Sequence, residues 1–256
     1  MTAPLLLLTP RYTADSRAVR AAALERGWAV TRMAARRVPE SAHGRAIVYY
    51  GEPDWAGVVM PRHVSLLRPS PTWLTTPPER YRKRAIRAAP LAEAQRDSDP
   101  AFVKPAREKR FPIGVYQPGS ALLAATAGLP ETLPVLVAEP VKWAVEIRCF
   151  VLDRRVVALS PYARSERSAQ SANGGWPFLP AEREHALDFI RAILDDPTVS
   201  LPAAVVVDIG VIVGRGWAVV EANEAWAAGL YGCEASAILP VLARTSVSPN
   251  AMARVD

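Results

Sequence analysis

The chain has 256 residues, half of them hydrophobic, which is enough to bury a sizeable core in one large domain or two closely packed ones. It has no apolar run as long as a membrane-spanning helix and no basic segment typical of a signal peptide, so we expect a cytoplasmic protein with no membrane partner. The formal net charge of +6 favours anionic partners such as nucleotides, whereas two distant cysteines and three scattered histidines lack the spacing of a zinc site.

The first 50 residues predict a small α/β module with a parallel sheet. Residues 5–8 form an apolar strand, residues 11–27 a helix that ends at a glycine, and residues 28–33 and 45–50 two further strands. Strand, helix and strand in this order are typical of a parallel sheet. Loops after such strands face the ligand crevice, so residues 51–54 are a candidate substrate contact, although an ordinary turn is the more frequent reading.

A proline-rich stretch at residues 69–78 marks a boundary, and we expect a basic helix at residues 79–89. The strand at residues 101–105 carries one lysine, Lys104, among apolar residues. A buried lysine is costly unless an anion meets it, which favours a ligand role for Lys104. The alternative is an edge strand that leaves the tip of this lysine in water.

Two hairpins are expected in the second half of the chain. Residues 145–152 and 155–160 form the first, which places Glu146 and Arg148 on one face, either as ligand contacts or as an intrastrand pair. The polar stretch at residues 165–177 is typical of a lid or a linker. We expect helices at residues 181–194 and 235–242.

The second hairpin joins residues 205–213 to residues 217–223 through a glycine turn. With Gly214 and Arg215 in the turn, Asp208 lies opposite Glu221; with Arg215 and Gly216 there, it lies opposite Asn223. Either register gathers two carboxylates and one amide oxygen on one face, a set that suits Mg²⁺. The alternative is a solvated polar face with no ligand.

The ordered series of features resembles the ATP-grasp superfamily of carboxylate–amine ligases, and most of all the clade named for two arginines and a lysine. The series comprises the strand lysine, a flexible loop, a Glu-Pro-Val hinge, a Glu-x-Arg hairpin, a basic loop with Asn-Gly-Gly and the Asp…Glu-x-Asn hairpin. It runs from about Phe102 to Cys233. The usual glycine-rich loop over the phosphates is replaced here by residues 107–110, Arg-Glu-Lys-Arg.

The resemblance implies a role for each matching residue. Contacts to ATP would come from Lys104, Lys109, Glu146 and the hinge residues Glu139, Pro140, Val141 and Lys142. Arg148 and Arg164 would hold the transferring phosphoryl group as catalytic residues, and Asp208, Glu221 and Asn223 would bind two Mg²⁺ ions. Arg110 is an alternative to Lys109, and Arg167 to Arg164, because each stands close by in the sequence.

We therefore expect an α/β fold with an N-terminal parallel-sheet module at residues 1–74 and a two-part ATP-grasp domain at residues 75–245. The two parts would meet at residue 142, and residues 246–256 would form a flexible tail. The resemblance implies a ligase that uses ATP and Mg²⁺ to join a small-molecule or peptide carboxylate to an amine through an acyl phosphate. Candidates for the substrate pocket are Tyr49, Tyr50, Glu52, Asp54 and Trp226, the last more often a core residue.

Three other functions remain open at this point. One is an ATP-grasp phosphotransferase that acts on a hydroxyl acceptor, and another is a nucleotide-binding module without catalysis. A basic nucleic-acid binder is the third, and we do not favour it because aromatic residues do not alternate with basic ones as in a stacking platform. Homodimers are a reasonable expectation for the assembly.

Overall fold

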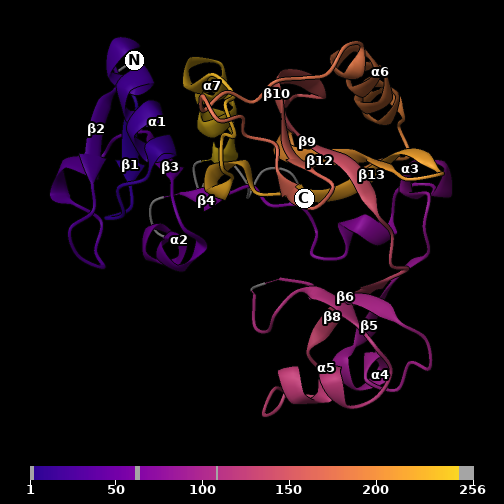
Figure 1. Ribbon diagram of the computed structural model, residues 1–256. Helices are drawn as coiled ribbons and strands as arrows, with labels where there is room; N and C mark the ends of the chain where they lie inside the picture. Colours follow the sequence, from indigo (N-terminus) through magenta and orange to yellow (C-terminus); the bar gives the residue numbers. More distant parts are fainter. Residues whose placement is uncertain (1–2, 61–63, 108, 248–256) are drawn as a thin grey trace.

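The computed structural model describes residues 3–60, 64–107 and 109–247 and has three parts, an N-terminal module and two antiparallel sheets (Figure 1). In the module, strands β1 (Leu5–Leu8), β2 (Ala29–Arg32) and β3 (Ile47–Tyr50) form a parallel sheet in the order β2-β1-β3. Helix α1 (Ala14–Glu25) begins at a Thr13 capping box and packs on this sheet through Val19 and Ala23. The predicted parallel module is confirmed.

The four-stranded sheet has the order β5-β8-β6-β7 and consists of β5 (Ile86–Pro90), β6 (Ala101–Pro105), β7 (Gly114–Tyr116) and β8 (Pro134–Ala138). Helices α4 (Leu91–Ala94) and α5 (Ser120–Ala125) cover one face (Figure 1). The register pairs Lys104 with Leu136 and Phe102 with Ala138, so these four side chains share the opposite face. Lys104 therefore places a cation among apolar neighbours on that face.

The predicted helix at residues 79–89 is wrong. Helix α3 covers only Glu79–Arg82, Lys83 adopts a left-handed φ of 54°, and residues 86–90 form strand β5. The charged segment has helical propensity, but Ile86 and Ala89 are buried where β5 pairs with β8. Tertiary pairing thus overrides the local preference.

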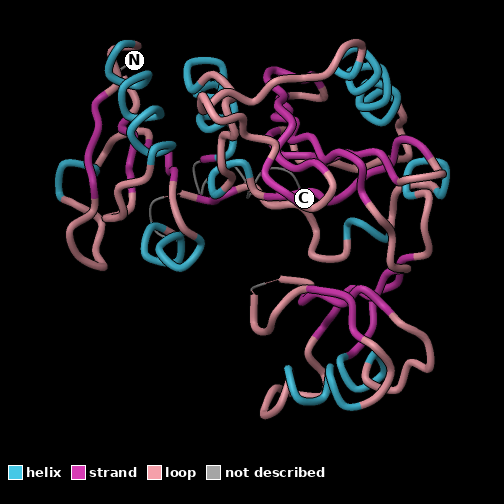
Figure 2. The backbone as a smooth tube through the Cα atoms, in the orientation of Figure 1, coloured by secondary structure: helices cyan, strands magenta, loops and turns pink. Residues whose placement is uncertain are grey.

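The five-stranded sheet has the order β11-β10-β9-β12-β13. Its strands are β9 (Trp143–Leu152), β10 (Arg155–Arg164), β11 (Arg167–Ser168), β12 (Ala204–Ile212) and β13 (Gly216–Asn223). Helix α6 (Glu182–Asp195) covers one face, and helix α7 (Ala235–Thr245) lies between the other face and the N-terminal module (Figure 1). The four-stranded sheet is joined to this part of the chain by two segments, residues 83–85 and the hinge at residues 139–142 (Figure 2).

The β12–β13 hairpin confirms the predicted pairing of Asp208 with Glu221, but with a different loop. Ile212 pairs with Gly216, which leaves three residues in the turn instead of two. Asp208 faces Glu221 while Ile209 faces Val219, so Val220 is an extra residue in β13. This β-bulge restores the register that the longer loop would otherwise shift by one residue.

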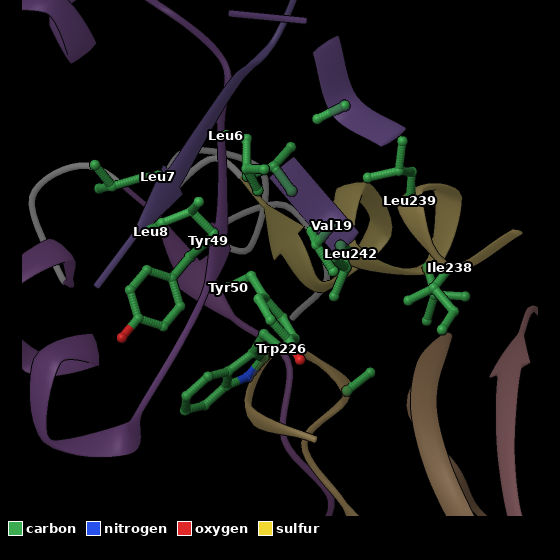
Figure 3. Close-up of a cluster of buried hydrophobic side chains, with 14 of the residues drawn as sticks. Leu6, Leu7, Leu8, Val19, Tyr49, Tyr50, Trp226, Ile238, Leu239 and Leu242 are labelled. Carbon is green, nitrogen blue, oxygen red and sulfur yellow. The ribbon is translucent and has the colours of Figure 1, made fainter. Parts of the chain in front are cut away.

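A hydrophobic core joins the N-terminal module to α7 and to the segment after β13 (Figure 3). Trp226 is fully buried, its ring lies 5.6 Å from that of Tyr49, and its Nε1–H donates to the Leu67 carbonyl at 3.0 Å. The hydroxyl of Tyr49 donates to the Glu52 carbonyl and that of Tyr50 to the Ala228 carbonyl. Tyr49, Tyr50 and Trp226 are therefore core residues whose polar atoms bond to backbone carbonyls.

Short elements complete the fold. Helix α2 (Pro53–Val59) is separated from the end of β3 by two residues, and exposed Asp54 lies in the first turn of the helix. Strand β14 (Ser246–Val247) pairs with β4 (Ser65–Leu66), so the first two residues of the predicted tail are in a strand, and residues 248–256 lie outside the described residues. No helix in the described ranges is long and apolar enough to span a membrane.

Candidate active site

A buried arginine–aspartate pair lies at the centre of the five-stranded sheet. Arg148 of β9 stands opposite Asp208 of β12, and its Nε and Nη2 donate to the two Asp208 oxygens at 3.0 and 2.7 Å. Burial of Asp208, which has no exposed surface, raises its pKa against the lowering effect of Arg148. Desolvation lowers the pKa of Arg148, but the carboxylate outweighs it and the guanidinium remains charged.

The other two predicted metal ligands join this pair. The Asn223 side-chain amide donates to Glu221 Oε1 at 2.8 Å and to Asp208 Oδ2 at 3.1 Å, which links the three side chains. Lys104 reaches across from the four-stranded sheet, with its Nζ 2.6 Å from Glu221 Oε2. Burial acts to raise the pKa of Glu221, but Lys104 and Asn223 hold it below its ordinary value. The predicted cation and the predicted ligands thus meet at one place.

Glu146 lies on the same face as Arg148, as the alternation predicted, but the two do not pair in the described contacts. Instead, the hydroxyl of Tyr162 donates to Glu146 Oε2 at 2.7 Å. Burial, together with the charges of Asp208 and Glu221, raises the pKa of Glu146. The half-buried Glu146 carboxyl can accept a hydrogen bond from a polar ligand such as a sugar hydroxyl.

Two tyrosines that the sequence did not single out enclose Arg148. The rings of Tyr162 and Tyr231 stack with centroids 5.2 Å apart, and the guanidinium carbon of Arg148 lies 4.9 Å from the Tyr231 ring. Because Ser160 faces Arg148, strand alternation could have placed Tyr162 on the same face. No strand pattern includes Tyr231, which lies in a turn with a φ of 47° beside Gly232. The aromatic faces stabilise the cation in a desolvated site.

The polar loop at residues 165–177 is docked on this cluster by one tryptophan. The Trp176 ring lies edge-on to Tyr231 at 5.3 Å. A Cβ atom on Gly232 would come 2.3 Å from Trp176 Cδ1, so only glycine permits this approach. The Trp176 end of the loop therefore lies against Tyr231 and Gly232.

The segment at residues 139–142, for which the resemblance implies a hinge, is held at both ends. The Glu139 N–H donates to the Ala85 carbonyl at 2.9 Å, and the Lys142 carbonyl accepts from the Val213 N–H at 3.0 Å. The Glu139 carboxylate also pairs with Arg215 at the tip of the β12–β13 hairpin. Pro140 and Lys142 are exposed, and Val141 lies between these two anchored positions. A cavity of about 430 Å³ borders this segment and is lined by four basic side chains, two glutamates and two apolar residues: Arg82, Lys83, Arg84, Arg215, Glu79, Glu139, Ala85 and Ile86.

Arg164 does not reach the site. It stands opposite Val145, on the face covered by α6, and its Nη1 and Nη2 donate to the two Glu182 oxygens at 2.6 Å. Simple alternation from Ser160, which faces Arg148, would put Arg164 on the site face, but a bulge at Tyr162 reverses it. Its neighbour Arg167 is exposed at the sheet edge, so neither of these alternatives joins Arg148.

Residues 81–241 match the model of an ATP-grasp domain family, the second family of the clade named for two arginines and a lysine, and this match covers more than half of the chain. The chain belongs to this family. No curated protein matches its sequence.

Solved structures of ATP-grasp proteins share the fold at low sequence identity. D-cycloserine synthetase DcsG is 14% identical with a TM-score of 0.61, over 94% of this chain and 99% of that chain. D-alanine–D-alanine ligase from Bacillus anthracis is 12% identical with a TM-score of 0.53, over 95% and 97%. The ATP-grasp ligase PsnB, complexed with a minimal precursor, is 14% identical with a TM-score of 0.53, over 96% and 100%. These likenesses confirm the mixed α/β ATP-grasp architecture.

The acidic set of this ATP-grasp domain fits Mg²⁺ in its chemistry. Two carboxylates supply oxygen ligands, and the Asn223 amide oxygen would join them only after its NH2 group, which donates to both carboxylates, turns away. Mg²⁺ prefers such partial sets, which substrate phosphates and water complete. Among the described residues no group of three or more His, Cys, Asp and Glu side chains is arranged to hold a metal ion. Arg148 and Lys104 pair with the two carboxylates, so the charges of this cluster are balanced within the protein.

Proposed function

We propose that this protein is an ATP-dependent ligase that joins a carboxylate to an amine through an acyl phosphate. The proposal rests mainly on one contact between the two sheets. Lys104 of the four-stranded sheet pairs with Glu221 of the five-stranded sheet, next to Asn223 and the Arg148–Asp208 pair. A triphosphate needs cations and Mg²⁺ ligands close together, and this cluster supplies both. Names of ligases among the structural relatives support the reaction class.

The nucleotide would lie between the two sheets. Val141 of the hinge would contact the purine, and the apolar face that surrounds Lys104 would cover it. Glu146 would accept hydrogen bonds from the ribose hydroxyls. Lys104 would turn from Glu221 to the α- or β-phosphate, and the loop with Lys109 would add positive charge beside the phosphates.

In the first step, an oxygen of the substrate carboxylate attacks the γ-phosphorus, the bond to the β,γ-bridging oxygen breaks, and ADP leaves. Arg148 would hold the transferring phosphoryl group, because a planar guanidinium matches two phosphate oxygens. Arg164 would not take part, because it lies on the face of the sheet covered by α6. Asp208, Glu221 and Asn223 would hold Mg²⁺, which when bound neutralises the charge on the phosphate oxygens.

In the second step, the amine nitrogen attacks the acyl carbon, loses a proton, and expels phosphate to leave an amide or peptide bond. Water would destroy the acyl phosphate, so the site must exclude it. The loop that Trp176 docks on Tyr231 would provide this cover. The acceptor would be a small molecule or a peptide.

Calorimetric titration of Mg·ATP into the wild type and the Glu221→Ala variant tests the proposal. The wild type should bind in a metal-dependent manner, and the variant should bind more than about tenfold more weakly and lose turnover while it stays folded. Glu131→Ala, at an exposed glutamate of the four-stranded part, is the matched control and should behave like the wild type.

The same titration decides among the alternatives. Unfolding of Glu221→Ala, or its full activity, would contradict the metal assignment. Absence of binding by folded wild type would contradict both a ligase and a phosphotransferase. If the wild type binds, amino acids and peptides should be screened for ADP release, and release with a hydroxyl acceptor and no amine would indicate a phosphotransferase instead.

A further inference from the structure

The position of Glu221 and Asn223 depends on one extra residue in β13. From Ile212 to Ile209, each residue of β12 faces the residue of β13 that continues the hairpin register. The bulge at Val220 then shifts the pairing, so that Asp208 faces Glu221. Without it, Asp208 would face Val220, and Glu221 and Asn223 would point to the opposite side of the sheet. The acidic set therefore exists only while the bulge is kept.

A bulge leaves backbone groups without ladder partners, and β13 is an edge strand of its sheet. Arg84 donates to the backbone at this bulge. Its Nη1 donates to the Val219 carbonyl at 2.7 Å and its Nη2 to the Val220 carbonyl at 3.1 Å. The planar fork thus bonds to the bulged residue and to the residue before it, a pair of contacts that a regular strand does not offer to one side chain.

Arg84 is itself fixed in place. Its side chain is buried, Nη1 also donates to the Arg82 carbonyl at 3.1 Å, and the guanidinium carbon lies 4.9 Å from the Trp143 ring. Trp143 in turn packs where a side chain on Gly210 would clash, since a Cβ there would come 2.9 Å from Trp143 Cε3. Burial lowers the pKa of Arg84 to about 10, so it stays charged at neutral pH.

We propose that Arg84 is a positioning residue that holds the Val220 bulge and thereby keeps Glu221 and Asn223 on the face of Asp208. This inference rests on the proposed function, because it assigns the Mg²⁺ ligands their geometry. Arg84 follows α3 and precedes β5, so it lies in one of the two segments that join the sheets. Through its hydrogen bonds, Arg84 links the connecting segment at residues 83–85 to β13, the strand that carries Glu221 and Asn223.

The test compares Arg84→Met and Arg84→Lys with the wild type. The apparent Mg²⁺ affinity at saturating ATP should fall about 10- to 100-fold in Arg84→Met, the usual effect of losing a residue that orients metal ligands. Arg84→Lys should lie between the two, because an ammonium has no planar fork for two carbonyls. Hydrogen exchange of the peptide that covers residues 216–223 should be faster in Arg84→Met.

Arg154→Met is the matched control. Arg154 also donates to three backbone carbonyls, those of Leu194, Asp196 and Val199, at 2.6, 2.7 and 3.0 Å, but at the end of α6. Its loss should lower the melting temperature and leave the Mg²⁺ dependence unchanged. This control separates positioning of the ligands from general loss of stability.

Each outcome bears on a different claim. A folded Arg84→Met, or a folded Arg84→Lys if the first variant does not fold, with wild-type Mg²⁺ affinity would overturn the inference. An equal loss of Mg²⁺ affinity in Arg154→Met would overturn it as well. Failure of the wild type to bind Mg·ATP would overturn the proposed function, and hydrogen exchange would then still show whether Arg84 holds the bulge.

Discussion

Strand β13 contains one bulge and β10 contains two, and the bulges at Val220 and Tyr162 have opposite consequences for the site. The extra residue Val220 brings Glu221 to the face of Asp208, whereas the shift at Tyr162 takes Arg164 to the face covered by α6. Both strands carry the residue types that the resemblance requires. One inserted residue in each decides which of these side chains reach the site, because side chains alternate between faces.

Two arginine–carboxylate pairs that involve these strands differ in burial. Arg148–Asp208 joins two neighbouring strands and is 9% and 0% exposed in its side chains. Arg164–Glu182 joins β10 to α6 and is 25% and 10% exposed. Their hydrogen bonds are similar in length. Burial and face, more than bond geometry, distinguish a candidate catalytic pair from a structural one.

The largest effect is expected at the buried pair. Arg148→Met should lower the free energy of unfolding by about 3–5 kcal/mol, because it leaves the Asp208 carboxylate buried without a partner. The double variant Arg148→Met/Asp208→Asn should recover part of this loss. Urea unfolding of both variants measures it, and equal stabilities would contradict the view that an unpaired charge is the cause.

An intermediate effect is expected at the contact between the sheets. Lys104→Met should weaken ATP binding about 10- to 100-fold, because a hydrogen bond to a charged group contributes about 1.5–3 kcal/mol. Calorimetry measures this affinity. Arg20→Met, at an exposed cation of α1 in the N-terminal module, is the control and should bind ATP like the wild type. Equal affinities for Lys104→Met and the control would remove Lys104 from the nucleotide site.

The smallest effect is expected on the α6 face. Arg164→Gln should keep ADP release within about threefold of the wild type and lower stability by about 1 kcal/mol at neutral pH. Burial acts to raise the pKa of Glu182, but Arg164 and the Leu179 N–H hold it below its ordinary value of 4.5. A lowered folded-state pKa gives stability that is present above pH 4.5 and is lost as the pH falls through the folded-state value.

The difference in stability between the wild type and Arg164→Gln should therefore shrink as the pH falls below 4.5. Thermal unfolding at a series of pH values measures this difference. A constant difference at all pH values would show that the ion pair is not its source. A large loss of ADP release would instead place Arg164 in catalysis and would contradict its assignment as a structural residue.

Strand alternation and motif order predicted much of the fold and of the site. The parallel N-terminal sheet, the strand with Lys104 and both hairpins followed from apolar patterns, and the pairing of Asp208 with Glu221 was among the expected registers. The predicted helix at residues 79–89 failed because β5 gains more from pairing with β8 than from its helical propensity.

The strand bulges and the contacts that depend on them could not be predicted from the sequence. Val220 stands beside no glycine or proline that would mark its bulge, and Pro161 before Tyr162 is compatible with a regular edge position as well as with a bulge. Arg84 could not be distinguished among so many arginines, since its role comes from two carbonyls that are distant in the sequence. Tyr231 reaches Arg148 through a turn that no local pattern predicts.

A crystal structure with Mg²⁺ and a non-hydrolysable ATP analogue would test the central claim most directly. We expect the phosphates between the two sheets, Mg²⁺ at Asp208, Glu221 and Asn223, and the Lys104 ammonium moved from Glu221 to a phosphate oxygen. A nucleotide bound elsewhere, with the Lys104–Glu221 ion pair intact, would contradict it.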